Sequence, residues 1–136
     1  MAKPRLVARI GVSVALVRRT DRAFLLVERA KPPAKNMWAF AGGKVEFGET
    51  LEQAAVRELH EETAIALCGS QLRFQKPIEI IARDGDEPVS HYVLMCFSAW
   101  VNDVEAVAGD DAADAGFFSL NEMGSLPVTA TTLEMA

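Results

Sequence analysis

Apolar residues along the chain form β-prone runs on both sides of one run with helical spacing. Residues 6–17 are rich in β-branched side chains and predict a long strand, and residues 23–28 predict a second strand after a turn at residues 20–22. Residues 72–82 and 91–101 are again apolar and β-prone, and the Asp-Gly-Asp-Glu-Pro sequence between them predicts a hairpin-like connection. The pattern therefore predicts strands before and after a central helix.

Shorter features complete the predicted layout. Gly42 and Gly43 follow a Trp-Ala-Phe-Ala run and mark a break, where the backbone adopts unusual dihedral angles or approaches another group closely. Residues 117–118 predict a last short strand or turn. Residues 121–124 predict one helical turn, and the segment from Thr129 onward predicts the start of a helix.

A helix is predicted for residues 51–63. Thr50 and Gln53 have the spacing of a capping box, and the residues that follow are nearly all tolerated in helices. At an advance of about 100° per residue, one face of this helix is apolar and is expected to be buried. The buried stripe consists of Leu51, Ala54, Ala55 and Leu59.

Three glutamates lie on or beside this stripe instead of opposite it. Glu58 and Glu62 fall inside the stripe, and Glu61 falls next to it. They occupy the last turn, where the helix dipole disfavours each anion by about 0.3–1 kcal/mol, and Glu58 with Glu62 is a like-charge pair four residues apart. An ordinary solvated surface, the usual interpretation of a charge cluster, predicts glutamates on the opposite face.

Carboxylates at this spacing repel one another. Two of them about 5 Å apart, at an effective dielectric constant of about 20, repel by about 3 kcal/mol, so three are not fully ionised together without a cation. Ligands that are all oxygen favour a hard ion over zinc. The cluster therefore predicts a Mg²⁺ site, with Mn²⁺ as the second choice.

Composition limits the fold and the classes of function. Of the 136 residues, 50% are hydrophobic, which predicts one compact domain over residues 1–136. Strands on both sides of a helix make this an α/β or α+β domain with a mixed sheet. The net charge of −5 argues against nucleic acid as the main partner, and no apolar run is long enough to span a membrane.

The cysteines and the N-terminal region predict a cytoplasmic protein. Cys68 and Cys96 form no CxxC pattern and are interpreted as buried thiols in a reducing compartment. The apolar run at residues 10–17 has arginines before and after it and no cleavage site of small residues, so it is interpreted as a strand and not as a signal peptide.

From Gly43 the sequence reads GKVEFGETLEQAAVRELHEETAI and resembles the Nudix box, G-x5-E-x7-R-E-U-x-E-E-x-G-U, in which U is a bulky apolar residue. Every fixed position is met except one, where Ala64 stands in place of glycine. A left-handed helix exit favours glycine, so alanine there costs about 1 kcal/mol or forces another exit. The strand layout around the box is similar to the Nudix α/β/α sandwich along most of the chain.

This resemblance implies hydrolysis of a nucleoside diphosphate linked to another group, by attack of water on the pyrophosphate. An acidic pocket repels an anionic pyrophosphate unless divalent ions lie between the two, which agrees with the Mg²⁺ site expected from the glutamates. Carried over by position, the implied metal ligands are Glu58, Glu61, Glu62 and the carbonyl of Gly42 or Gly43.

The resemblance also implies supporting roles for two further residues. Arg57 orients the glutamates through charge-assisted hydrogen bonds, and Glu49 fixes Arg57 in turn. From spacing alone, Arg57 is equally well explained by a surface ion pair with Glu61, four residues later.

The general base is left open between the box helix and a later loop. On the helix, Glu58 or Glu61 is the candidate; in the loop it is Asp111, which is equally well explained as part of a solvated Asp-rich turn. For substrate binding, Arg29 is a candidate for phosphate contacts and Trp38 for stacking on a base or sugar. Their alternatives are a solvated loop cation and a core aromatic.

The box recognises diphosphate and metal, so it does not specify the attached group. The segments around it look most like the compact bacterial group of ADP-ribose pyrophosphatase-like enzymes, which makes ADP-ribose or a nucleotide sugar the expected substrate class. A (d)NTP pyrophosphohydrolase of the nucleotide-sanitising type is the alternative, ahead of a non-catalytic nucleotide-binding module and a purely structural acidic domain. Many family members are dimers; the oligomeric state is left open, with a homodimer as one alternative.

Overall fold

The computed structural model describes residues 6–32 and 34–136. Strands predominate, and one long helix lies in the middle of the chain. In chain order the elements are β1 (Arg9–Arg18), β2 (Phe24–Arg29), β3 (Trp38–Ala39), β4 (Ala41–Lys44), α1 (Leu51–Thr63), a 3₁₀ turn η1 (Gly69–Gln71), β5 (Arg73–Asp84), β6 (Glu87–Val101), β7 (Ala112–Phe118), α2 (Leu120–Met123) and α3 (Ala130–Met135).

A seven-stranded mixed sheet forms the centre of the molecule. Its order is β3-β2-β1-β6-β5, with β4 paired to β1 and β7 paired to β2. β1 and β6 run parallel from Arg9↔Tyr92 to Arg18↔Val101, and the other named strand pairs are antiparallel. The predicted α+β class with a mixed sheet is confirmed.

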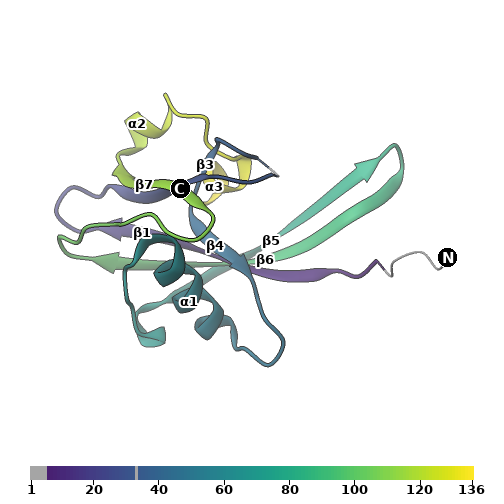
Figure 1. Ribbon diagram of the computed structural model, residues 1–136, viewed down its shortest axis with the longest axis horizontal. Coiled ribbons are helices and arrows are strands. Elements are labelled where there is room, and N and C mark those ends of the chain that lie inside the picture. The colour runs from purple at the N-terminus through teal and green to yellow at the C-terminus, as the bar shows by residue number, and fades with distance from the viewer. Residues whose placement is uncertain (1–5, 33) are drawn as a thin grey trace.

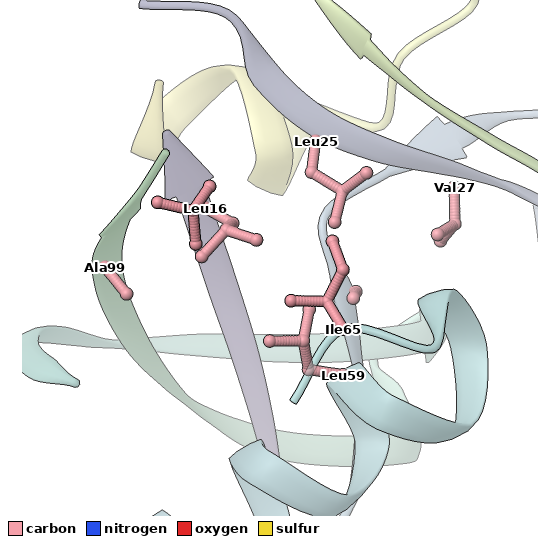
Figure 2. Packing of buried hydrophobic residues seen from close by; sticks show 8 residues of the cluster. Leu16, Leu25, Val27, Leu59, Ile65 and Ala99 are labelled. Carbon is pink, nitrogen blue, oxygen red and sulfur yellow. The ribbon is translucent and has the colours of Figure 1, made fainter. Parts of the chain in front are cut away.

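Helices cover both faces of this sheet (Figure 1). Along β1, Val12, Val14 and Leu16 belong to clusters that include α1 residues, whereas Ala15 packs in a cluster with Met123 of α2. This alternation follows from the two-residue period of a strand. Figure 2 shows the α1 side, where leucines of the helix and of two strands meet. The structure is therefore the expected α/β/α sandwich.

Helix α1 has the bounds that its sequence predicts. The Thr50 Oγ1 accepts from the Gln53 N–H at 3.1 Å, and the Gln53 Oε1 accepts from the Thr50 N–H at 2.9 Å, so the capping box is closed in both directions. Ala54, Ala55 and Leu59 are fully buried. Fully burying a leucine contributes about 1.5–3 kcal/mol, so packing of this stripe holds the helix against the sheet.

The helix ends through the left-handed exit in spite of its alanine. Ala64 has φ 63° and ψ 6°, and its N–H donates to the His60 carbonyl at 2.8 Å. Of the two alternatives that the sequence leaves open, the chain therefore adopts the strained one. Because left-handed backbone is unfavourable for a residue with a Cβ, Ala64 stores about 1 kcal/mol or more of strain.

We expect Ala64→Gly to raise the free energy of unfolding by about 1 kcal/mol, or the melting temperature by roughly 4 °C, without changing turnover. Ala64 is exposed, so no buried surface is lost. Thermal denaturation measures the shift. The matched control is Ala66→Gly, also at an exposed position but without positive φ, which should lose about 0.4–1 kcal/mol. Equal changes in melting temperature for Ala64→Gly and Ala66→Gly would show that the backbone at Ala64 is not strained.

Several predicted boundaries and one burial prediction are wrong. The strand predicted from residue 6 begins at Arg9, and the β5–β6 connection is a tight turn because both strands extend further than predicted. Gly42 and Gly43 do not form a break with unusual dihedrals; they lie in β4, where pairing with β1 keeps them extended. Cys96 is buried as expected, but Cys68 is exposed.

The described residues contain no helix that is long and apolar enough to span a membrane.

Candidate functional site

The guanidinium of Arg57 joins three carboxylates and one carbonyl at the inner face of α1. Its Nε and Nη2 donate to the two oxygens of Glu49 at 2.7 and 3.0 Å. Its Nη1 donates to Glu58 at 2.9 Å and to Glu61 at 3.2 Å, and Nη2 also donates to the Lys44 carbonyl at 3.0 Å. The ion pair with Glu61 that spacing alone suggests is present, but it is one contact among several.

Glu49 and Arg57 form a two-point ion pair that is mostly shielded from solvent. The side-chain exposures are 14% for Glu49 and 24% for Arg57. The Arg57 hydrogen bonds hold the pKa of Glu49 down at about 2, and the Glu49 bonds raise the pKa of Arg57 further. Planar two-point pairing fixes the orientation of a guanidinium, so Glu49 sets the direction from which Arg57 reaches Glu58.

The Glu58 carboxylate lies directly against strand β4. A Cβ on Gly43 would lie 2.5 Å from the carboxyl carbon of Glu58, and a Cβ on Gly42 would collide with the Val12 carbonyl of β1. The glycines therefore permit close approach on two sides, which is the second of the alternatives expected for them. Burial raises the pKa of Glu58, while the bond from Arg57 lowers it.

Glu62 is the most perturbed carboxyl of the cluster. Its Oε2 accepts a hydrogen bond from the Gly42 N–H at 3.1 Å. Burial raises its pKa to about 8; the negative charges of Glu58 and Asp110 act in the same direction, and the Gly42 N–H and the Arg29 charge oppose it. A buried carboxyl with a raised pKa is unfavourable as a lone negative charge, and a bound cation would stabilise its ionised form.

The loop after β6 packs against the C-terminal end of α1. The Val107 N–H donates to the Thr63 carbonyl at 2.8 Å, and the Gly109 N–H donates to the Glu62 carbonyl at 3.1 Å. A Cβ on Gly109 would lie 2.7 Å from the Glu61 carbonyl. These bonds satisfy helix-end carbonyls and bring the loop near enough for the negative charge of Asp110 to act on Glu58 and Glu62.

Asp110 and Asp111 have different environments. The Asp111 Oδ1 forms an ion pair with Lys31 Nζ at 2.8 Å, between side chains that are 56% and 70% exposed. It is the charge of Asp110, with φ 52°, that contributes to the raised pKa of both Glu58 and Glu62. Sequence reasoning chose Asp111 from this pair; Gly109, which precedes both, was the only signal that the backbone here approaches the helix.

The two substrate-binding candidates lie in different places. Arg29 ends β2, and its charge reaches Glu62, so it belongs to the surroundings of the cluster. Trp38 is 9% exposed and packs edge-on against Phe118 at 5.0 Å between ring centroids, in the cluster that contains Met123 of α2. For Trp38 the structure favours the alternative interpretation, a core aromatic on the sheet face away from α1.

The carboxylates suit a hard divalent ion by their chemistry. Within residues 6–32 and 34–136, no three acidic, histidine or cysteine side chains form a ready-made metal site, and Glu61 is held by Arg57. Glu58 and Glu62 nevertheless present oxygen donors at partly buried positions, where burial and, to a smaller extent, the negative charge of Asp110 oppose full ionisation. Oxygen-only donors with excess negative charge fit Mg²⁺ or Mn²⁺.

Comparison with known proteins identifies the family of the chain. The model of the NUDIX domain family matches residues 7–134. The chain is 34% identical over 126 residues to a protein of Methanocaldococcus jannaschii named ADP-ribose pyrophosphatase, covering 93% of this chain and 72% of that protein. The crystal structure of a MutT NUDIX hydrolase from Burkholderia pseudomallei superposes with a TM-score of 0.79 at 28% identity, covering 94% of this chain and 95% of the other.

A larger protein from Francisella tularensis contains a similar domain. Its crystal structure is described as a bifunctional NMN adenylyltransferase/ADP ribose pyrophosphatase complexed with AMP and a manganese ion. The TM-score is 0.75 at 26% identity, and the match covers 98% of this chain but 41% of the other. The similarity therefore concerns one part of that protein.

Proposed function

The chain belongs to the Nudix family and is a Nudix hydrolase, and from this premise we propose that it cleaves the pyrophosphate of ADP-ribose or a nucleotide sugar with Mg²⁺. One observation carries the proposal: Glu58 and Glu62 both lie against the glycine backbone of β4, where burial raises the pKa of each and the charge of Asp110 acts on both. The name of the archaeal relative supports the substrate class.

The proposed metal ligands are Glu58, Glu61 and Glu62, with the carbonyl of Gly42 or Gly43. When bound, a divalent ion neutralises the phosphates and makes the attacking water more acidic. Arg57 acts as a positioning residue, because one guanidinium bonds both Glu58 and Glu61.

Other residues of this chain are proposed to contact the substrate phosphate and to accept the proton of the attacking water. Arg29, whose charge already reaches Glu62, is the proposed contact to a substrate phosphate. A proton from the attacking water passes to a nearby carboxylate, for which Glu58 and Glu61 on the helix and Asp110 or Asp111 in the loop are the candidates.

The proposal is tested by measuring Mg²⁺-dependent turnover of ADP-ribose, nucleotide sugars, dinucleoside polyphosphates, ordinary (d)NTPs and oxidised dGTP. We expect the highest kcat/KM for ADP-ribose or a nucleotide sugar, with AMP or another mononucleotide as a product, and no turnover in EDTA. A clear preference for a (d)NTP would establish the nucleotide-sanitising alternative. Tight binding of a nucleotide by the folded protein without turnover would establish a binding module.

A matched pair of substitutions distinguishes the roles of Asp110 and Asp111. Because the charge of Asp110 acts on Glu58 and Glu62 while Asp111 pairs with Lys31, we expect Asp110→Asn to lower kcat by about 10-fold or more and Asp111→Asn to change it less than a few-fold. Both variants remove one charge from adjacent positions, so each controls for the other. A loss of about 100-fold in Asp111→Asn alone would assign the base or a metal ligand to Asp111.

A further inference from the structure

Lys31 and Asp111 join two loops that meet beside the sheet. The Lys31 Nζ lies 2.8 Å from the Asp111 Oδ1, and the Ala30 N–H donates to the Asp111 carbonyl at 3.0 Å. Lys31 follows the end of β2, and Asp111 comes directly before β7, the strand that pairs with β2. The ion pair therefore adds a side-chain contact where the β2–β7 ladder ends.

The same two loops lie within electrostatic reach of the carboxylates of α1. The charge of Asp110 acts on Glu62, and so does the charge of Arg29, two residues before Lys31. The hydrogen bond from Lys31 to Asp111 and the negative charge of Asp111 raise the pKa of Lys31, with a smaller effect from Asp110. Lys31 is therefore a charged ammonium at the rim of the acidic cluster.

The base of the loop that carries Lys31 is fixed by backbone hydrogen bonds, whereas the side chain is open to solvent. The Arg29 N–H donates to the Met37 carbonyl at 2.9 Å, and the Asn36 N–H donates to the Arg29 carbonyl at 2.8 Å. The Lys31 side chain is 70% exposed, and the Asp111 side chain is 56% exposed. Exposed ion pairs contribute little to stability, so a competing anion opens this one readily.

We propose that Lys31 binds a phosphate of the substrate, and that this phosphate replaces Asp111 as the partner of the Lys31 ammonium. The proposal rests on the proposed function, because it requires a pyrophosphate at the acidic cluster. Phosphate and carboxylate oxygens accept from an ammonium in the same way, and lysine binds phosphate as a point charge without a fixed geometry. In the free protein, Asp111 therefore occupies the place of the anion that Lys31 binds.

The charges around the cluster favour Lys31 for this contact over Arg57. A pyrophosphate that approaches α1 meets the negative charges of its glutamates, so it needs positive charge besides the divalent ion. Arg57 already donates to three carboxylates and one carbonyl. Within residues 6–32 and 34–136, Lys31 has one ion-pair partner, and that partner is exposed.

Asp111 competes with the phosphate in this arrangement. The loop base stays fixed by the bonds at Arg29, and the backbone bond from Ala30 does not depend on the Asp111 side chain. Removal of the Asp111 charge therefore leaves Lys31 within reach of the substrate and frees its ammonium. We expect Asp111→Asn to lower KM by about 3-fold.

Steady-state kinetics with Mg²⁺ at low ionic strength, on the best substrate of the panel, test the contact. Lys31→Ala should raise KM by at least about 10-fold with kcat within about 3-fold of normal, because it removes a contact to substrate outside the reacting centre. Lys31→Arg keeps the charge and should keep KM within about 3-fold. Lys35→Ala removes the same charge from an exposed position of the same loop and should leave KM unchanged.

A double variant distinguishes phosphate binding from simple neutralisation of Asp111. If Lys31 only neutralised Asp111, Lys31→Ala combined with Asp111→Asn would have the KM of the unsubstituted protein. We expect the KM of this double variant to stay at least about 3-fold above that value, because the contact to phosphate is still missing.

Calorimetry gives the same comparison without turnover. With Mg²⁺ and the methylene analogue of ADP-ribose, whose P–C–P bridge is not hydrolysed, Lys31→Ala should raise Kd by at least about 10-fold and Lys35→Ala should not change it. If the preferred substrate is a (d)NTP, the proposed substrate class fails, while the KM comparison on that (d)NTP still decides the role of Lys31. A KM of Lys31→Ala within about 3-fold of normal, or a double variant that regains the original KM, would overturn the proposal.

Discussion

Glu62→Gln is expected to lower Mg²⁺-dependent turnover by at least about 100-fold and, at pH 8, to make the metal-free protein more stable. Activity is expected to fall because Glu62 is a proposed metal ligand and the substitution removes its negative charge. Stability rises because the neutral amide oxygen still accepts from the Gly42 N–H, while no buried carboxyl has to ionise. Opposite signs for the two effects identify a residue that is retained for chemistry and not for folding.

The pH dependence follows from the raised pKa of Glu62, about 8 in the folded state. Between its ordinary value and pH 8 the folded protein keeps a proton that the unfolded chain releases, so the stability of the metal-free protein falls as pH rises from about 5 to 8. The slope for one such group is at most about 1.4 kcal/mol per pH unit, and Glu62→Gln should recover roughly 2–4 kcal/mol at pH 8.

Denaturant unfolding in EDTA between pH 5 and 9, with initial rates in Mg²⁺, measures both effects. Mg²⁺ should raise the melting temperature of the unsubstituted protein at pH 8 and have little effect on the variant. The control is Glu52→Gln in the first turn of α1, at an exposed position, which should change neither rate nor pH profile. Turnover within a few-fold of normal in Glu62→Gln would remove Glu62 from the site.

Arg57→Ala is expected to lower kcat by about 100-fold and Arg57→Lys by about 10-fold, with a weaker response to Mg²⁺ in both. One guanidinium donates to Glu49, Glu58 and Glu61. A lysine carries the same charge but lacks the planar shape that makes these contacts together. The kcat, KM and Mg²⁺ activation constant of each variant separate positioning of the ligands from substrate binding. Arg19→Ala, at an exposed position, is the control.

Acid unfolding gives a second measurement on Arg57. The pKa of Glu49 is held at about 2, so the stability that this pair contributes is present above the ordinary carboxyl pKa and is lost as pH falls toward 2. In Arg57→Ala that contribution is absent, and acid unfolding should begin at a higher pH. If the variant kept normal Mg²⁺ activation, Arg57 would be a structural pair partner of Glu49 and not a positioning residue for the ligands.

Local patterns predicted α1 and its glutamates correctly. The capping box, the buried Ala54, Ala55 and Leu59 and the position of Glu58 and Glu62 at the inner face depend on residues three or four apart, and the sequence contains that spacing in full. Strand bounds were predicted less well, because pairing with a distant strand decides where β1 begins and how far β5 and β6 extend.

The sequence by itself determined the amphipathic helix and the Arg57-Glu58-Glu61-Glu62 cluster, because both follow from short-range spacing. The same spacing carried the family resemblance, and the resemblance in turn implied the sandwich. Only the tertiary structure decided the long-range contacts. Gly43 makes room for Glu58, and the Gly42 N–H donates to Glu62. The loop at Gly109 brings the charge of Asp110 within reach of both glutamates, while Asp111 forms an ion pair with Lys31. These contacts join segments far apart in the chain, and their partners are set by packing of β4 and the loop against α1, which no local pattern records.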